Sequence, residues 1–318
     1  MSSPNITFAA TAASSGFVTV DLEETTIVAL LLMALVILLI LVLNPICLVA
    51  LRRASAMHDS TKILMASLTI SDLCTGVLCA VPQITEDISQ RWILGDFLCL
   101  MWGIAYPSTI ILSVTSLLLL TIDRFIAIVH PLRHPCIMTS LSSKVIVGVT
   151  WTSAYLTNVV LYGVYFQATA SKRTYYRCNY SDVEVYIYSS ICTLAFPLVI
   201  ILVLYLYILR VAQRQARRIA DQNHATSEEQ NAGRRLSTKS ATTVFIVTGT
   251  VFICWTPALI LLLLFITQQI TFHPSMSIAA KAVLFSNSWL NVIIYYWRNA
   301  ELRQAIRGVI SCICRHLC

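Results

Sequence analysis

The chain has 318 residues, of which 57% are hydrophobic and only 12% are charged, and its formal net charge is +7. Soluble domains contain about 25% charged residues, so a chain with half that share does not face water over most of its length. The composition therefore excludes an ordinary soluble globular protein and indicates a membrane protein.

Seven long apolar segments follow one another along the chain, and each is long enough to cross a bilayer as a helix. They cover Thr26–Leu51, Lys62–Val81, Asp96–Val129, Lys144–Phe166, Val183–Val211, Ser240–Thr267 and Ser277–Trp297. Backbone polar groups must be satisfied inside lipid, and these segments are too long and too evenly apolar for barrel strands. We therefore predict an all-α membrane protein with a seven-transmembrane helix bundle over residues 26–297.

Basic residues set the predicted orientation. Seventeen of the 22 Lys and Arg residues fall on the cytoplasmic side if residues 1–25 lie outside the cell, as the positive-inside rule requires. Topology thus explains the charge excess, which gives no reason to expect nucleic acid as a partner. Asn5 and Asn179 each begin a glycosylation sequon on the predicted outside. Residues 1–24 show no pattern of a cleavable signal peptide, so we expect the first helix to act as a signal anchor.

An amphipathic stretch follows the last apolar segment. Its apolar residues recur at helical spacing: Leu302, Ile306, Val309 and Ile310. Arg303 and Arg307 lie on the opposite side of such a helix. We predict that residues 298–318 form a short eighth helix on the inner membrane surface and a short cytoplasmic tail. Cys312 and Cys314 in this tail are candidates for palmitoylation, and free thiols are the alternative.

The third apolar segment ends in Asp123-Arg124-Phe125, and Pro131-Leu132 follows shortly afterwards. Two opposite charges at the membrane edge cost free energy, so their presence indicates a function. The pattern resembles the Asp-Arg-Tyr motif of rhodopsin-like (class A) G-protein-coupled receptors, with phenylalanine in place of tyrosine. Further matches to this family occur in other segments: Asn44, Leu68–Asp72, Trp151, Pro197, Tyr205, Cys254–Pro257 and Asn287–Tyr295.

The resemblance implies a plasma-membrane receptor that transmits an extracellular ligand signal to a heterotrimeric G protein by an outward movement of helix six. Arrestin is a further implied partner. Asp123 would hold Arg124 at rest, and Leu132 would contact the G protein. The expected coupling residues are Asp123, Arg124, Leu132, Tyr205 and Tyr295. The motifs at residues 134–139 and 294–303 are most similar to the melanocortin, cannabinoid and adenosine branch.

Two other classes of membrane protein fit the sequence less well. A transporter would favour broken helices and a repeat of its own topology, and neither is present. No cluster of His, Asp and Glu with catalytic or metal-binding spacing faces the interior, so we do not expect an enzyme.

Asp72 lies near the middle of the second segment, where an ionisable side chain indicates a functional site. Neighbouring helices offer neutral oxygen-bearing side chains: Ser113, Asn287, Ser288 and Asn291. One carboxylate with neutral oxygens suits a small hard cation, and in the resembling family this cluster binds sodium, which favours the inactive state. A purely structural hydrogen-bond network is the alternative. We expect no other cofactor.

Besides Phe125, three positions depart from the family pattern. Ser237 stands where many relatives carry an acidic residue that restrains the helix-three arginine, so that restraint is expected to be absent. It also follows Arg234-Arg235, as in sites for basophilic kinases, and phosphate there would add charge at the start of helix six. Val251 and Val292 replace the usual phenylalanine and proline, so we expect helix seven to be straighter at Val292. Val251 and Val292 motivate an alternative function, a receptor-fold protein that couples poorly and acts as a partner or ligand sink.

The resemblance also defines an expected ligand pocket in the outer half of the bundle. Its predicted residues are Tyr106, Thr109, Ile110, Trp255, Leu259, Leu262, Lys281 and Phe285. Amine receptors carry aspartate at the position of Tyr106, and opsins carry lysine at the position of Phe285. A monoamine or retinal is thus disfavoured, and the mainly apolar lining favours a lipid-like ligand or a peptide.

Cys99 lies at the outer end of the third segment, and Cys178 lies in the second outer loop. Both face an oxidising compartment, in which disulfides persist. We predict that these two residues are bonded, which would pin the loop over the mouth of the bundle.

Overall fold

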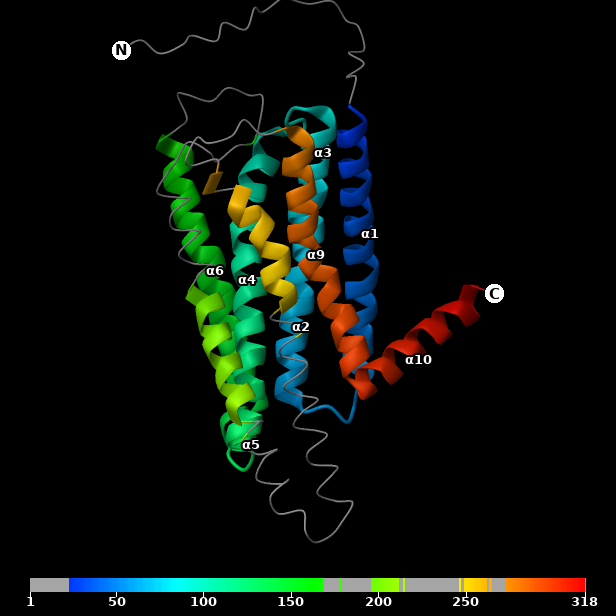
Figure 1. The fold of residues 1–318 in the computed structure, drawn as a ribbon, viewed down its shortest axis with the longest axis vertical. Coiled ribbons are helices and arrows are strands. Elements are labelled where there is room, and N and C mark those ends of the chain that lie inside the picture. The colour runs from blue at the N-terminus through cyan, green and yellow to red at the C-terminus, as the bar shows by residue number, and fades with distance from the viewer. Residues whose placement is uncertain are drawn as a thin grey trace, which may run out of the picture.

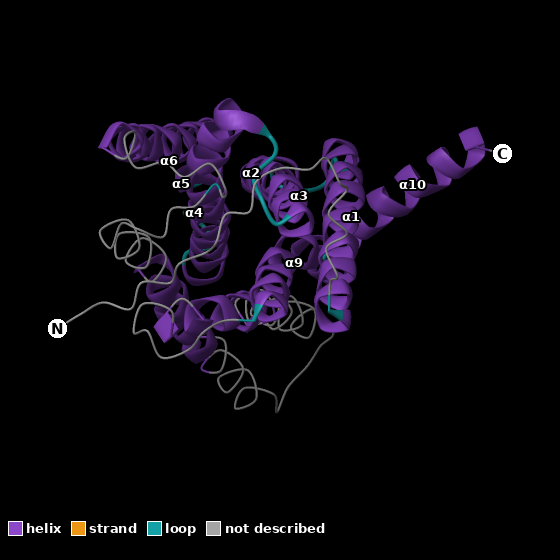
Figure 2. Cartoon of the chain, turned by 90° about the horizontal axis from the view of Figure 1, so that it is seen from above, coloured by secondary structure: helices purple, strands orange, loops and turns teal. Residues whose placement is uncertain are grey.

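The computed structural model describes residues 23–168, 178, 196–211, 214, 246, 249–261, 263–264 and 273–317. The regular elements of these ranges are helices, arranged as a bundle (Figures 1 and 2). In chain order they are α1 (Glu24–Arg53), α2 (Asp59–Cys74), η1 (Thr75–Ala80), α3 (Val81–Ser89), α4 (Gly95–Val129), α5 (His134–Ile137), α6 (Ser140–Ala168), α9 (Pro274–Arg298) and α10 (Ala300–Leu317). Two shorter apolar helices, Phe196–Val211 and Gly249–Leu261, lie between α6 and α9 in the chain.

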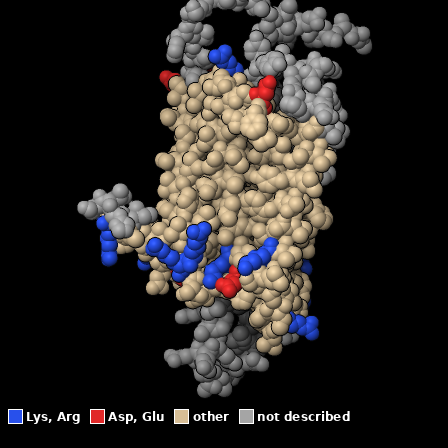
Figure 3. Space-filling view, turned by 180° about the vertical axis from the view of Figure 1, so that it is seen from behind, with Lys and Arg blue, Asp and Glu red and all other residues tan. Residues whose placement is uncertain are grey.

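Five of these helical stretches are long and apolar enough to cross a membrane: Glu24–Arg53, Asp59–Ser89, Gly95–Val129, Ser140–Gly163 and Pro274–Arg298. The two shorter apolar helices lie within the fifth and sixth predicted segments. The predicted helical bundle is therefore confirmed. The space-filling view in Figure 3 shows a broad band without Lys, Arg, Asp or Glu, with basic side chains gathered below it. We call the end of the bundle at α5 the inner end and the end at Cys99 the outer end.

The second transmembrane stretch is longer than its apolar sequence predicted. It continues through a wide π-helical turn, η1, into α3, which ends at Ser89. The last turns of α3 contain polar residues such as Gln83, Glu86 and Asp87. A hydropathy pattern therefore does not detect this part of the helix. Gly76 in η1 packs against α1, where a Cβ atom would lie only 2.6 Å from the Ile40 Cγ2 atom. Glycine is therefore needed for this close approach of α1 and η1.

The buried side chains form two main clusters along the bundle. The cluster towards the outer end joins α1, η1, α4 and α9 and includes Met33, Ala105 and Phe285. The larger cluster towards the inner end joins most of the helices, and Trp255 and Tyr295 belong to it. In Figure 2, α2 and α3 lie between α4 on one side and α1 with α9 on the other. This central position brings the polar residues of α2 next to α4 and α9.

The last helix, α10, leaves the inner end of α9 and extends outward beyond α1 (Figure 1). Asn299 caps its start, because the Asn299 Oδ1 atom accepts hydrogen bonds from the backbone N–H groups of Glu301 (3.0 Å) and Leu302 (3.1 Å). Three of the four predicted apolar residues are buried against the bundle: Leu302, Ile306 and Val309. The fourth, Ile310, is 45% exposed.

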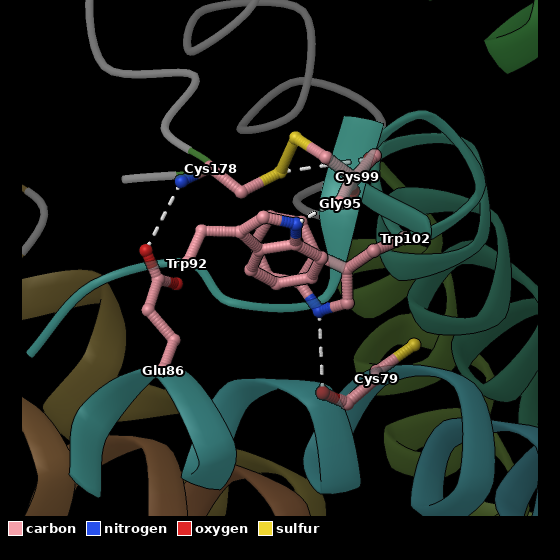
Figure 4. Close-up of a disulfide and its surroundings, with 7 residues drawn as sticks. All are labelled: Cys79, Glu86, Trp92, Gly95, Cys99, Trp102 and Cys178. Carbon is pink, nitrogen blue, oxygen red and sulfur yellow. Dashed lines mark hydrogen bonds between the residues drawn. A yellow bond between two sulfur atoms is a disulfide. The ribbon is translucent and has the colours of Figure 1, made fainter. Parts of the chain in front are cut away.

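At the outer end, Cys99 and Cys178 form the predicted disulfide, with their Cα atoms 5.7 Å apart (Figure 4). The Glu86 Oε1 atom accepts a hydrogen bond from the Cys178 backbone N–H at 3.1 Å. The Trp102 indole N–H donates to the Cys79 carbonyl oxygen at 3.2 Å, which ties α4 to η1. The disulfide and the Glu86 hydrogen bond attach Cys178 to α4 and α3 at the mouth of the bundle.

Candidate functional site

Asp123 at the inner end of α4 is fully buried and surrounded by hydrogen-bond donors. Its carboxylate accepts hydrogen bonds from the Arg124 Nε atom (3.0 Å), the Thr61 hydroxyl (3.0 Å) and the His134 Nε2 atom (2.9 Å). The Ser60 hydroxyl is a more distant donor at 3.5 Å. A buried carboxylate is tolerated only where charges and hydrogen bonds compensate for lost water. Donors from α2, α4 and α5 meet this requirement here.

The Arg124 side chain is held by residues of this same cluster around Asp123. Its Nη2 atom donates hydrogen bonds to both Asp123 Oδ2 and Thr61 Oγ1. The guanidinium is thus restrained by its neighbour in the chain and by the first turn of α2. The sequence indicated the Asp123–Arg124 pair, whereas the roles of Thr61 and His134 were missed. The one sequence signal for Thr61 is a run of small hydroxyl residues at the polar start of the second helix.

The other predicted coupling residues differ in their surroundings. Leu132 is 92% exposed in the loop between α4 and α5, so its apolar side chain points into solvent. Tyr205 is buried with Ile208, and Phe125 packs against them. Tyr295 is buried separately in the larger cluster. The structure therefore does not bring the two tyrosines into one cluster.

Asp72 is buried in the centre of the bundle and accepts hydrogen bonds from two other helices. The Ser113 hydroxyl donates to Asp72 Oδ1 at 3.2 Å, and the Asn291 Nδ2 atom donates to Asp72 Oδ2 at 3.0 Å. The Ser288 side chain also lies beside this carboxylate. The Asn44 Nδ2 atom donates to the Ser288 carbonyl oxygen at 3.4 Å, which connects α1 to the cluster.

The oxygen-bearing side chains around Asp72 fit a small monovalent cation. Within the described residues, two buried amide oxygens of the predicted sodium site, Asn287 Oδ1 and Asn291 Oδ1, have no hydrogen-bond partner. Buried acceptors without donors are costly, and a hard cation prefers oxygen ligands of this kind. Asp72, Ser113, Ser288 and the two asparagines are therefore the residues that would hold a sodium ion.

In the outer half of the bundle, aromatic rings run from the first outer loop towards α9. Trp92 and Trp102 have ring centroids 5.9 Å apart, and Trp102 and Tyr106 have centroids 5.1 Å apart. Tyr106 then meets Phe285 edge-to-face at 6.1 Å. Edge-to-face contact is a favourable geometry for aromatic pairs. Two predicted pocket residues, Tyr106 and Phe285, are thus brought together.

Other predicted pocket residues do not all share this environment. Thr109 is fully buried, and its Oγ1 atom lies 3.3 Å from the Cys79 Sγ atom, so it faces η1. Trp255 is buried in the larger cluster, against which Ile110 and Leu259 pack. Leu262 lies outside the described residues, as do Ser237, Asn5 and Asn179.

The predicted pocket lysine is paired with an aspartate that sequence reasoning missed. The Lys281 Nζ atom lies 3.1 and 3.3 Å from the two carboxylate oxygens of Asp87. The Gln83 Nε2 atom donates to the same carboxylate at 3.2 Å. Because Asp87 and Lys281 neutralise one another, the ion pair offers no net charge to a ligand. This ion pair joins α3 to α9 on the outer side of Phe285.

The two valine departures are core residues. Val251 is buried in the same cluster as Trp255. Val292 is also buried there, and α9 runs as one helix through Val292 to Arg298. Among the described residues, the Trp255 indole N–H is buried without a hydrogen-bond partner.

Near the end of α10, Cys312 is half-buried and Cys314 is exposed, and both are free thiols.

Comparisons with known proteins agree with this geometry. Residues 43–295 match the model of the 7 transmembrane receptor (rhodopsin family). The allatostatin-A receptor of Bombyx mori is 26% identical over 86% of this chain and 76% of its own length. The D(1C) dopamine receptor of Xenopus laevis is 26% identical over 92% of this chain and 69% of its own. The human histamine H2 receptor is 24% identical over 80% and 72%, respectively.

The family match covers most of the chain, and these relatives are receptors named for peptide and amine ligands. The match begins next to Asn44 and ends at Tyr295, so it includes Asp72 and the Asp123–Arg124 pair. The apolar helices make this chain a multi-pass membrane protein. The chain therefore belongs to the rhodopsin family of seven-transmembrane receptors.

Proposed function

We propose that this receptor, with its N-terminus outside the plasma membrane, transmits an extracellular ligand signal to a heterotrimeric G protein by an outward movement of helix six. The observation that carries the proposal is the restraint on Arg124 at the inner end. Its guanidinium is bound to Asp123 and Thr61, so it is not free to contact a partner. Ligand binding near Tyr106 and Trp255 would favour a state in which these bonds are released, which is a population shift.

The proposal does not require an acidic restraint on helix six. Thr61 supplies a restraint from α2 instead, because its hydroxyl bonds to both members of the Asp123–Arg124 pair. Leu132, which is exposed beside this site, supplies an apolar contact for the G protein. Arrestin would recognise the same inner face after activation. Sodium at Asp72 would stabilise the resting state, since its ligands come from several helices.

For the ligand, we propose a peptide or a lipid-like molecule. Tyr106 offers no carboxylate to a ligand ammonium group, and the ammonium of Lys281 is paired with Asp87. The aromatic and apolar lining favours burial of an apolar group. The allatostatin-A receptor, which matches this chain over most of its length, is named for a peptide.

The experiment is ligand-free G-protein activation in cells, across the Gα classes, for the wild type and Arg124→Ala at matched surface expression. We expect a basal signal in at least one class that the variant loses. Arg53→Ala is the matched control, because Arg53 is an exposed arginine at the inner end of α1 without a role in this site. An equal signal from Arg124→Ala and the wild type would contradict the proposal.

A receptor-fold protein that couples poorly and acts as a ligand sink is the second candidate. Val251 and Val292 favour it, because both replace residues that usually take part in activation. A silent wild type that stays silent with a bound agonist would support this candidate. Agonist-driven signalling would exclude it.

A further inference from the structure

The Asp87–Lys281 ion pair in the outer half of the bundle is neutral as a whole but strongly dipolar. The Lys281 Nζ atom lies 3.1 and 3.3 Å from the two carboxylate oxygens of Asp87. The Gln83 Nε2 atom donates to Asp87 Oδ1 at 3.2 Å, so the carboxylate is also held from the preceding turn of α3. A charged acceptor and a charged donor are thus fixed side by side.

Neither partner of this ion pair is fully enclosed or fully used. The side chains of Lys281 and Asp87 are 25% and 14% exposed, respectively, so an incoming group can reach both. An ammonium group has three N–H donors, and among the described residues Lys281 hydrogen-bonds only to the two oxygens of Asp87. A carboxylate has about four acceptor positions, of which Lys281 and Gln83 take three. Each partner can therefore form one more hydrogen bond while the ion pair stays closed.

An aromatic pair lies on the inner side of the ion pair. Lys281 and Phe285 are four residues apart on α9, so they share one face of that helix. The Phe285 ring meets the Tyr106 ring edge-to-face, with centroids 6.1 Å apart. A ligand whose polar group reaches the ion pair would therefore place its apolar part against these two rings.

Electrostatics separates the polar groups that could bind to the ion pair. A ligand group with a single charge would be attracted by one partner and repelled by the other, and it would bring an uncompensated charge out of water. A zwitterion would avoid this imbalance, but two charges would lose their hydration. A neutral primary carboxamide costs less to desolvate, and its planar group presents the carbonyl oxygen and one N–H on the same side. Its oxygen can accept from Lys281 while that N–H donates to Asp87.

We propose that the Asp87–Lys281 pair binds a primary carboxamide attached to an aromatic or apolar group, such as the amidated C-terminus of a peptide. This inference rests on the proposed ligand-binding function of the outer half and names the polar group that the site takes. The carboxamide bridges the Lys281 ammonium and the Asp87 carboxylate, and the adjoining apolar group packs against Tyr106 and Phe285. A backbone amide cannot form this bridge, because in a trans peptide the N–H points away from the carbonyl oxygen. The site therefore distinguishes an amidated chain end from the rest of a peptide.

The test measures binding of N-acetylphenylalanine amide to the purified full-length receptor in neutral detergent by ligand-observed NMR. A ligand of this size should bind with a Kd of about 1 mM. Its N-methylamide is the matched probe, because the methyl group replaces the N–H that lies on the same side as the carbonyl oxygen. A hydrogen bond to a charged group contributes about tenfold in affinity, so the N-methylamide should bind about tenfold more weakly.

Two other probes test the charge and the source of the carboxamide. N-acetylphenylalanine, the free acid, should bind more weakly than the amide, because Asp87 repels its carboxylate. N-acetylglutamine N-methylamide carries its primary carboxamide on a side chain without an aromatic ring. It should also bind more weakly than N-acetylphenylalanine amide, since it cannot place a ring against Tyr106 and Phe285.

A double variant assigns the preference for the primary amide to the ion pair. Asp87→Asn/Lys281→Met removes both charges together and keeps an acceptor for Gln83. The affinity ratio of the primary amide to the N-methylamide should fall from about tenfold to about twofold, as expected for a neutral hydrogen bond. This ratio is the readout because a general loosening of the receptor would weaken both probes alike.

The matched control is Asp59→Asn/Lys62→Met, which removes an ion pair at the inner end in which the two groups are 3.0 Å apart. The control should keep the tenfold ratio of the wild type. If the first double variant melts below the wild type, Lys281→Arg is the comparison. It keeps the charge and the donors, so it should retain the preference for the primary amide.

Five results would overturn the proposal. Equal affinity of the wild type for the primary amide and the N-methylamide would exclude the bridge, and an unchanged ratio in Asp87→Asn/Lys281→Met would place the bridge elsewhere. Tighter binding of the free acid would show that Lys281 acts as a single charge. Tighter binding of the glutamine probe would assign the site to a side-chain amide. No binding of any probe at several times the expected Kd would remove the site. Coupling through Arg124 is measured by G-protein activation and not by these affinities, so the two proposals fail separately.

Discussion

Replacing Thr61 with valine removes one hydroxyl from the restraint on Arg124 while nearly preserving the shape of the side chain. The Thr61 hydroxyl donates to Asp123 at 3.0 Å and accepts a hydrogen bond from Arg124. Under the proposed mechanism, Arg124 leaves this position on activation. Thr61→Val should therefore destabilise the resting state more than the active state and raise ligand-free signalling.

The size of the effect follows from the two bonds. A hydrogen bond to a charged group contributes about 1.5–3 kcal/mol, but the Arg124 side chain is 36% exposed, so water replaces part of the loss. We take the lower value, about 1.5 kcal/mol, for the pair of bonds together. This free energy shifts the ratio of active to resting receptor about tenfold. If the active fraction of the wild type is small, basal signalling should rise by a similar factor.

The assay is ligand-free G-protein activation at matched surface expression, in the Gα class that gives the largest wild-type signal. Thr69→Val is the control, because Thr69 is also a buried threonine of α2 but its hydroxyl donates to the Met65 carbonyl oxygen at 2.8 Å. Basal signalling that is equal in Thr61→Val and the wild type would refute the reasoning. So would an equal rise in both threonine variants, since it would reflect a general loosening of α2.

Three further predictions concern other parts of the molecule. Asp72→Asn should abolish the effect of sodium on agonist affinity, measured by agonist binding in sodium and in potassium buffers; unchanged sodium dependence would remove the ion site. Gly76→Ala should lower stability by about 1–3 kcal/mol, seen as a lower melting temperature, because the new Cβ would lie 2.6 Å from Ile40 Cγ2. Gly148→Ala is its control, since a Cβ there meets no atom within 4 Å, and equal melting of both variants would contradict the packing argument. Cys99→Ser should destabilise the receptor by about 2–5 kcal/mol and reduce surface expression; wild-type expression and melting would show that the disulfide is dispensable.

The candidate site was only partly predictable from the sequence. Asp72, Asp123 and Arg124 were identified because an ionisable side chain in an apolar segment can be recognised from the sequence alone. Their partners were not, because the hydroxyl of Thr61 is unremarkable beside many others. Lys281 was predicted as a pocket residue, but its pairing with Asp87 joins residues 194 positions apart. A hydropathy pattern carries no information about such a pair.

The sequence by itself determined the helical segments and the chemistry available in each, because lipid requires about 20 apolar residues per crossing and a helical backbone. The tertiary structure decided which side chains meet. The π-helical turn η1 joins α2 to α3, and Asp87 of α3 pairs with Lys281 of α9. The packing of α2 against α4 brings Thr61 to the Asp123–Arg124 pair. These contacts depend on the rotation and depth of whole helices, which are set by side chains along their full length.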